Sequence, residues 1–362
     1  LGDVYKRQVS VLLFGNKSIQ WEEALKQNYG FDMQLWRNLN LSFDYFVENR
    51  SKILVQPQSV PMLQGIPQSA IPSSNIGKVN NRGFEIELNY VQPVTKDLTM
   101  QFRGTFNYNK NKVTYIDEPI NSSDYVYRYR QMGFPMNTNW GYKIDYSNGN
   151  GFFNTQEELD EYLSHTTYSF GTPGLGDFKY MDLNEDGVVD EKDQVPLRYT
   201  KIPRITYGFS LGLDYKGIDF TIFFQGVSKY SHFSGTTQNV YEWTKEGTYY
   251  NYHKRAWTKE RYENGEKITY PALHTGDNVN TRANDFFVFD RSFIRLKNIE
   301  LGYTLPQRWL RAIGISKVRV YVSGQNLWTH SPQVADHIDP EQDDPIRYPL
   351  TKMMNVGVNI SF

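Results

Sequence analysis

The feature that most constrains the fold is the strict alternation of apolar and polar or small residues at the end of the chain, residues 353–362. Such alternation places the two kinds of side chain on opposite faces of an extended strand. The apolar positions are Val356, Val358, Ile360 and Phe362. One apolar face and one polar face suit a strand with lipid on one side and water on the other. A strand of a soluble sandwich alternates in the same way, so this segment alone predicts only β-structure.

The cleanest strand pattern lies in residues 84–90, where Glu85 and Glu87 alternate with apolar residues. Two carboxylates on one strand face require water beside them. The segment 100–108 repeats the alternation, and the short link 95–97 between the two predicts a hairpin. The polar residues expected to line a water-filled lumen are Glu85, Glu87, Arg103 and Asn107.

The remaining strand candidates bring the expected number to roughly ten or eleven. They are 29–37, 39–48, 139–146, 204–215, 218–230, 293–304 and 317–329, and a short apolar run at 9–14 precedes them. The apolar phase slips between Leu296 and Ile299, which predicts a bulge near Asn298. Residues 50–74 are interpreted as a loop, and 231–290 is too long for an ordinary connection. We therefore predict an all-β, antiparallel transmembrane barrel wall with short turns at one end and long loops at the other.

Composition supports a membrane wall and excludes several other classes of protein. Aromatic residues make up 15% of the chain, with 27 Tyr and 7 Trp, the residue types that suit membrane interfaces. There is no apolar run of the length that a transmembrane helix needs. The net charge of −1 gives no reason to expect a nucleic-acid partner. No catalytic residues are proposed, because no nucleophile elbow or phosphate-binding loop is present.

One segment carries a chemical motif of its own, D-L-N-E-D-G-V-V-D-E-K-D at 182–193. Its oxygen-bearing residues have the spacing of a calcium loop, with Gly187 at the sharp turn. The expected ligands are Asp182, Asn184, Asp186, the Val188 carbonyl, Asp190 and Asp193. The final ligand is Asp where Glu is usual, so the last ligand has a shorter side chain. A structural Ca²⁺ is expected here, and the alternative is a solvated acidic turn.

Aromatic residues in the long loop 231–290 are candidates for ligand contact. Tyr and Trp can stack on sugar rings or anchor a partner, and they can equally pack the loop against itself. The candidates are Tyr241, Trp243, Tyr249, Tyr250, Tyr252 and Trp257. Tyr241, Trp243 and Trp257, together with Glu85, Glu87 and Arg103, form the set of substrate-binding candidates. The pair Glu85 and Glu87 is interpreted as lumen lining and not as a catalytic pair.

Several segments taken in order resemble the SusC/RagA family of TonB-dependent outer-membrane transporters. The matching segments are Trp21-Glu22, Asn49–Leu54, Asn75–Leu88, Asp177–Asp190, Pro203–Gly208, Gln225-Gly226, Ser292–Pro306, Gly324–Leu327, Asp339–Glu341 and Asn359–Phe362. The chain departs from the family pattern before Asp177, because Pro173-Gly174 stands three residues before Gly176-Asp177. That departure affects only the expected geometry of this loop.

The resemblance implies the C-terminal half of a barrel of about 22 strands that is closed by a plug. Residues 9–362 would supply this barrel part, with the plug domain absent, and residues 1–8 are interpreted as a non-native leader. The resemblance further implies import of a glycan or oligopeptide across the outer membrane of a Gram-negative, Bacteroidota-like cell. TonB would supply the energy through the missing N-terminal part, and a SusD-like surface lipoprotein would be the partner.

Three alternatives remain open from the sequence. A siderophore or cobalamin receptor would share the barrel and differ in cargo. An outer-membrane enzyme would need a nucleophile and a base that converge at one rim. A secreted β-sandwich adhesin would need polar residues on both outer faces, whereas each strand here has one apolar face.

Overall fold

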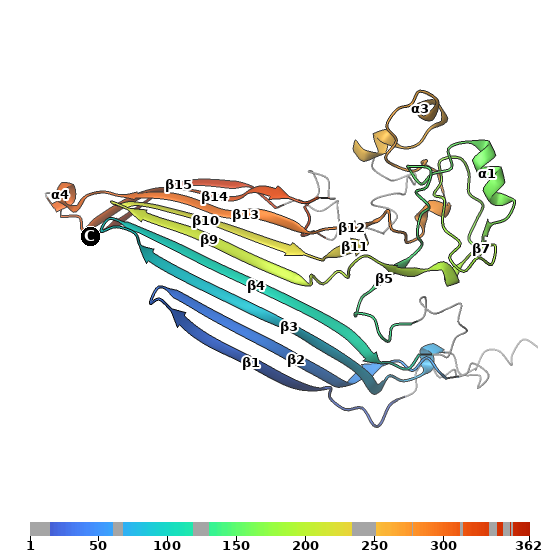
Figure 1. The fold of residues 1–362 in the computed structure, drawn as a ribbon, viewed down its shortest axis with the longest axis horizontal. Coiled ribbons are helices and arrows are strands. Elements are labelled where there is room, and N and C mark those ends of the chain that lie inside the picture. The colour runs from blue at the N-terminus through green and yellow to red at the C-terminus, as the bar shows by residue number, and fades with distance from the viewer. Residues whose placement is uncertain are drawn as a thin grey trace, which may run out of the picture.

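The computed structural model describes residues 15–60, 68–118, 130–233, 251–276, 278–311, 314–332, 339–342, 348 and 350–362. Its main body is one antiparallel sheet with strand order β1-β2-β3-β4-β9-β10-β13-β14-β15 (Figure 1). The strands are β1 Glu23–Leu35, β2 Leu39–Val55, β3 Ser74–Pro93, β4 Leu98–Tyr115, β9 Ile205–Tyr215, β10 Ile218–Ser228, β13 Phe293–Thr304, β14 Lys317–His330 and β15 Met353–Ser361. We call this nine-stranded sheet the wall. It confirms the predicted antiparallel β fold.

Short connections lie at one end of the wall and long ones at the other, as predicted (Figure 1). The β9–β10 hairpin turns on Lys216 and Gly217, with φ of 49° and 86°. Two residues with positive φ give a turn whose twist matches the flanking strands. A Cβ at Gly217 would lie 2.8 Å from the Thr304 carbonyl oxygen, so the neighbouring connection also favours glycine. The predicted hairpin at 95–97 is confirmed between β3 and β4.

The two faces of the wall differ in chemistry. On one face, aromatic rings of adjacent strands stack in a row, with centroids 5.6 Å apart for Phe31–Phe43, 6.2 Å for Phe43–Phe84 and 5.8 Å for Phe84–Phe106. The opposite face carries the carboxylates Glu85 and Glu87. We call these the apolar face and the polar face. Pairs of aromatic residues on neighbouring strands are a main source of sheet stability.

The predicted bulge near Asn298 is confirmed. The register between β13 and β14 shifts between Leu296 and Asn298, so that Lys297 has no single partner on β14. Asn326 on β14 adopts a positive φ of 53° at the same place. The bulge keeps the apolar residues on either side of it on one face despite the extra residue.

Three predicted boundaries were wrong. β1 ends at Leu35, because Trp36 and Arg37 take positive φ in a turn. β2 continues to Val55, within the segment 50–74 that was interpreted as a loop. Residues 139–146 do not join the wall. This segment supplies only the short β5, Asn139–Gly141, among the long loops. Because the candidate 139–146 leaves the wall, the wall has nine described strands where ten or eleven were predicted. The short apolar run 9–14 lies outside the described residues.

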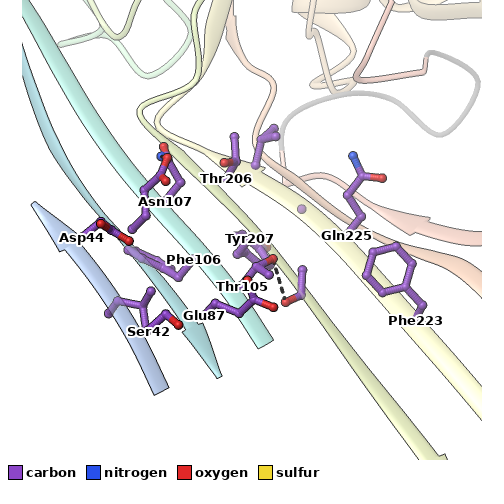
Figure 2. A pocket seen from close by; sticks show the side chains of 15 residues that line it. Ser42, Asp44, Glu87, Thr105, Phe106, Asn107, Thr206, Tyr207, Phe223 and Gln225 are labelled. Atoms are coloured by element: carbon purple, nitrogen blue, oxygen red, sulfur yellow. Dashed lines mark hydrogen bonds between the residues drawn. The ribbon is translucent and has the colours of Figure 1, made fainter. Parts of the chain in front are cut away.

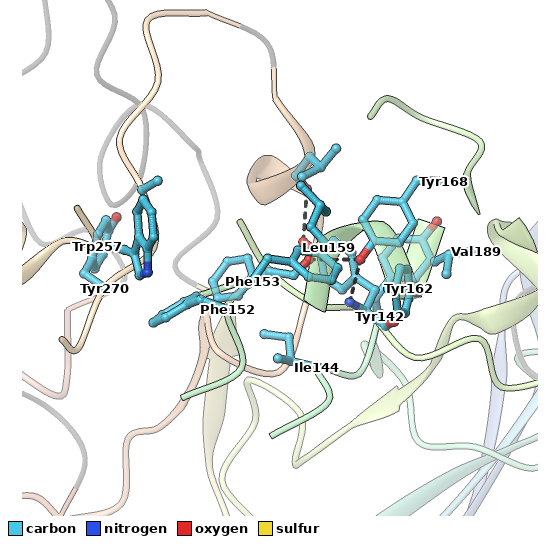
Figure 3. Close-up of a cluster of buried hydrophobic side chains, with 14 of the residues drawn as sticks. Tyr142, Ile144, Phe152, Phe153, Leu159, Tyr162, Tyr168, Val189, Trp257 and Tyr270 are labelled. Atoms are coloured by element: carbon cyan, nitrogen blue, oxygen red, sulfur yellow. Dashed lines mark hydrogen bonds between the residues drawn. The ribbon is translucent and has the colours of Figure 1, made fainter. Parts of the chain in front are cut away.

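The long loops fold together into a compact unit, the cap, made of residues 139–200 and 251–287 (Figure 1). Its core is rich in aromatic rings (Figure 3). The cap contains the helix α1, Gln156–Leu163, whose N-cap Thr155 accepts a hydrogen bond from the Glu158 N–H. The Glu158 carboxylate in turn accepts from the Asn154 N–H at 3.0 Å. The helix is thereby fixed at its first turn.

Short elements complete the described structure. The short strands are β6 Thr167–Tyr168, β7 Val188–Val189, β8 Val195–Leu197, β11 Ser231–Phe233 and β12 Val288–Asp290. The short helices are η3 Gln68–Ala70, η5 Glu191–Asp193, η6 Asn251–Arg255, α3 Lys259–Glu263, η7 Val279–Thr281 and α4 Gln307–Leu310. Within the described ranges, no helix combines the length and the apolar character needed to cross a membrane.

Candidate functional site

The polar face of the wall contains a hollow of about 440 Å³, which we call the polar pocket (Figure 2). It is formed by β2, β3, β4, β9 and β10, strands that are consecutive in the sheet. Its polar lining consists of Ser42, Asp44, Glu85, Glu87, Thr105, Asn107, Thr206 and Gln225. Phe223 adds an aromatic ring, which lies over Gly208 because glycine leaves room for it.

The predicted lumen residues lie together on this face. Glu85 accepts a hydrogen bond from the Asn107 amide at 2.6 Å, and Glu87 pairs with the Arg103 guanidinium at 2.8 Å. Each carboxylate therefore has its own partner on β4, which supports lumen lining and gives no arrangement for paired acid–base work. The side chains of Arg103 and Glu87 are 63% and 49% exposed, so water screens their attraction and leaves both available to a solute.

A second charged group crosses the polar face near the short turns. Arg319 on β14 pairs with Asp219 on β10 and with Glu300 on β13. Asp219 lies opposite Gly302 in the β10–β13 register. A Cβ at Gly302 would lie only 2.4 Å from Arg319 Nη2 and 2.6 Å from Asp219 Oδ2. The missing side chain at Gly302 therefore lets one guanidinium connect strands that are not neighbours.

A third charged group is buried at the loop end of the wall. The side chain of Arg295 on β13 is 2% exposed and donates to Asp339 at 2.8 Å and to Glu341. Its Nε donates to the Thr329 hydroxyl on β14 at 2.9 Å. A guanidinium with two carboxylates and a hydroxyl has the charge and the hydrogen bonds that burial requires. The segment Asp339-Pro340-Glu341 is therefore held to the wall.

The cap removes one of the aromatic candidates from the solvent. Trp257 is 7% exposed, and its indole N–H donates to Asn154 Oδ1 at 3.2 Å within the buried core (Figure 3). A Cβ at Gly176 would lie 2.4 Å from the Trp257 ring. For Trp257 the structure thus favours packing of the loop against itself, the alternative that the sequence left open. Tyr241, Trp243, Tyr249 and Tyr250 lie outside the described residues.

One ionisable pair joins the two loops that make up the cap. The Asp177 carboxylate is buried and accepts hydrogen bonds from His274 Nε2 at 2.6 Å and from Asn280 at 2.7 Å. Its other oxygen accepts from the Gly174 N–H at 2.8 Å, which closes the loop at the departure from the family pattern. The hydrogen bond from His274 to Asp177 raises the pKa of His274 above its ordinary value.

The predicted calcium loop forms a tight turn whose carboxylates mostly hold backbone groups. Asp193 is buried and accepts from the N–H groups of Leu183 at 2.7 Å and Asp190 at 2.8 Å. Burial raises the pKa of Asp193, and those backbone donors act in the opposite direction. Lys192 Nζ lies 2.9 Å from Asp186, and this hydrogen bond lowers the pKa of Asp186.

One atom of this loop fits a cation. Asp182 Oδ2 accepts from the Gly187 N–H at 2.8 Å, while Asp182 Oδ1 is buried with no hydrogen-bond partner. A buried carboxylate oxygen without a partner is costly unless a cation lies against it. Among the described residues, however, no three His, Asp or Glu side chains already converge as a metal site. The loop therefore has one oriented ligand, and Lys192 supplies the positive charge beside Asp186.

Sequence reasoning missed five of the polar lining residues of this pocket: Ser42, Asp44, Thr105, Thr206 and Gln225. They come from β2, β4, β9 and β10, and the register places Asp44 beside Glu85 and Thr206 beside Asn107. Alternation within a segment shows on which face of the sheet a residue lies. How far along the wall the residue lies depends on the register between neighbouring strands, and turn length fixes that register only within one hairpin.

Comparison with known proteins places these features in a family context. No protein-family model matches the chain. It is 26% identical over 100% of its length to TonB-dependent receptor P3 of Formosa agariphila, covering 36% of that protein. It is 25% identical over 100% of its length to TonB-dependent receptor SusC of Bacteroides thetaiotaomicron, covering 34% of that protein.

A solved structure of the RagAB peptide transporter has the same fold, with a TM-score of 0.69 at 20% identity. The match covers 96% of this chain and 36% of the solved chain. The chain thus spans about a third of the length of the proteins that it matches. The matches confirm the resemblance that the sequence motifs indicated.

Proposed function

We propose that this chain is the C-terminal barrel part of a SusC/RagA-like TonB-dependent transporter. On this premise, it forms part of the wall of an outer-membrane importer. The apolar face of the wall contacts lipid, and the polar face lines the route of the cargo. The observation that carries this proposal is the separation of the two faces, with a stacked aromatic row on one and the polar pocket on the other.

The polar pocket favours a cargo rich in hydrogen-bonding groups. Its lining presents carboxylates, amides and hydroxyls together with the Phe223 ring, which suits a glycan or an oligopeptide. TonB supplies the energy for import, and a SusD-like surface lipoprotein covers the loop end, where the cap lies. A siderophore or cobalamin receptor is the alternative cargo class. The described polar face presents side-chain pairs suited to binding, which supports a transport role.

Uptake experiments test this function directly. A strain that lacks the complete transporter should fail to grow on the glycan or peptide fraction that the transporter imports, and the wild-type gene should restore growth. Replacement of Asp44, Glu85 and Glu87 by their amides should lower uptake at an unchanged level of folded protein. As a matched control, Glu157→Gln, Glu161→Gln and Glu263→Gln change exposed carboxylates of the cap and should leave uptake intact. Unchanged uptake in the pocket variant would contradict the role of the polar face.

We also propose that the loop 182–193 takes a structural Ca²⁺. Asp182 Oδ1 supplies the oriented ligand, and Asn184, Asp186, the Val188 carbonyl, Asp190 and Asp193 complete the set once Lys192 moves aside. The ion would offset the repulsion among the carboxylates and stiffen this edge of the cap. What supports the proposal is the motif together with the unpartnered Asp182 oxygen.

Calcium titration of the complete transporter tests this site. Calcium should raise the unfolding temperature of the cap, and Asp182→Asn should abolish the increase. Lys192→Gln should strengthen binding, because it removes the cation that competes for Asp186. Glu161→Gln is the control, since this carboxylate is exposed on α1 and is not one of the expected ligands. The absence of saturable binding at millimolar calcium in the wild type would overturn the proposal.

A further inference from the structure

Three cations follow directly after the aromatic row on the apolar face. Arg82 on β3 lies opposite Lys110 on β4, one step beyond the opposed pair Phe84 and Tyr108, whose rings are 5.6 Å apart. Lys112 lies opposite Asn80 at the next step. The register is continuous through these pairs, so all of these side chains lie on the apolar face. We call Arg82, Lys110 and Lys112 the rim cations.

The rim cations have no counter-charge of their own within the described part of the chain. All three are exposed, and the ion pairs of the neighbouring strands involve other residues, such as Arg103 with Glu87. Arg82 and Lys110 face each other directly, and like charges opposed in a sheet repel. An external anion at this place would relieve that repulsion.

The rim cations share a hollow of about 370 Å³. It is completed by Asn80 and Thr114 and by the segment with Gly133 and Pro135. Backbone hydrogen bonds hold this segment beside β4, from Gly133 N to Val113 O at 2.8 Å and from Val113 N to Phe134 O at 2.9 Å. A guanidinium, two ammonium groups, an amide and a hydroxyl around one hollow provide the donors that bind phosphate oxygens.

The depth of the hollow distinguishes a lipid headgroup from a free anion. On β3 the apolar face runs from Tyr90 to Phe84, about 20 Å at the rise of an extended strand. That length approaches the apolar band of about 25 Å typical of outer-membrane barrels. The hollow begins where this band ends and lies on the side of the long loops. Lys229 adds a further cation at this level, with Nζ 5.8 Å from the centre of the Tyr108 ring.

We propose that the rim cations bind the phosphorylated headgroup of a lipid in the leaflet on the loop side of the membrane. This inference rests on the proposed membrane function, since it requires the apolar face to contact lipid. The Tyr108 and Phe84 rings lie against the start of the acyl chains, and the hollow receives the phosphate. The contact would fix the height of this part of the wall in the membrane.

Lipid binding to the complete transporter in nanodiscs tests the proposal. The probe is diphosphoryl lipid A mixed into phosphatidylcholine, followed by thermal unfolding and by native mass spectrometry. The variant Arg82→Gln/Lys110→Gln/Lys112→Gln should bind roughly a hundredfold more weakly at low salt, from about fivefold per cation near an anionic surface. The control Lys254→Gln/Lys259→Gln/Lys267→Gln removes three exposed cations of the cap and should bind as the wild type does.

Two further arms decide the source of the anion. Fully dephosphorylated lipid A should bind as weakly to the wild type as diphosphoryl lipid A binds to the triple variant. Equal binding of the two lipids, or full reproduction of the effect by free inorganic phosphate, would overturn the proposal. The variant Arg82→Lys/Lys110→Arg/Lys112→Arg keeps the charge and should retain binding, which separates a lost site from a folding defect. Cargo uptake is measured separately, so failure of lipid binding does not coincide with failure of the transport proposal.

Discussion

The wall and the cap are stabilised in different ways, although one chain alternates between them. The cap has a dry core in which Phe153 and Phe178 are 0% exposed, whereas the stacked rings of the wall remain accessible on the apolar face. Backbone hydrogen bonds stabilise the wall, since each strand of the sheet is hydrogen-bonded to its neighbours along its length. Side-chain packing stabilises the cap, where strands are only two or three residues long. The cap is therefore a small globular unit, and the wall depends on its surroundings.

The largest expected effect comes from separating the wall from its surroundings. β1 and β15 are the edges of the described sheet, and unpaired backbone groups at membrane depth are not satisfied by lipid. We predict that this chain alone shows no heat-modifiable migration on a gel, whereas the complete transporter does. The cap, with its internal core, should still give a protease-resistant piece. A heat-modifiable band from the isolated chain would contradict the prediction.

The next largest effect comes from a cavity in the cap. Phe178→Ala removes a fully buried ring that packs against Phe152 and Phe286, and should cost about 3–5 kcal/mol of cap stability. Phe43→Ala on the apolar face should cost less, because lipid chains fill the space. Limited proteolysis of the complete transporter measures both. Equal costs for the two variants would remove the distinction between wall and cap.

A smaller effect is expected from a methyl group on the polar face. Gly302→Ala forces Arg319 and Asp219 apart and should destabilise the wall by about 1–3 kcal/mol, as overpacking does. Gly212→Ala on the same face is the control, because its nearest contact would be an ordinary 3.4 Å to Gln101 Cβ. Urea unfolding in detergent compares them. A Gly302 variant as stable as the Gly212 variant would show that the ion pairs around Arg319 tolerate displacement.

The smallest effect is a pH dependence confined to the cap. Because the folded cap raises the pKa of His274, the His274–Asp177 pair stabilises the cap fully below the unfolded pKa of about 6.5. The contribution is lost as the pH rises through the higher pKa of the folded state. His274→Gln should flatten this dependence, while His165→Gln, at an exposed position, should keep it. Cap unfolding followed by tryptophan fluorescence provides the measurement.

The sequence predicted the wall better than the cap for a physical reason. Alternation with a period of two residues is local, so the polar faces at Glu85 and Glu87 and the bulge near Asn298 could be recognised within single segments. The cap is built from contacts between loops far apart in the chain, such as the one between Trp257 and Asn154. Alternation in 139–146 resembles that of a wall strand, and only its long-range packing places it in the cap.

The site was predicted in the same uneven way. Glu85, Glu87 and Arg103 were placed on the correct face, because side-chain direction follows from the position within a strand. For Trp257 the sequence left both ligand contact and packing of the loop against itself open, and its ring is buried. In the folded core Trp257 packs with small residues such as Ala256 and Ala272. Small residues give no local sign in the sequence that a tryptophan is buried.

The buried Arg295 has a consequence for the order in which the barrel is assembled. The guanidinium belongs to β13, whereas Asp339 and Glu341 belong to the last connection before β15. A buried guanidinium without its carboxylates is costly, and so is a buried Asp339 without the guanidinium. The end of β13 and this last connection are therefore expected to lose their water together.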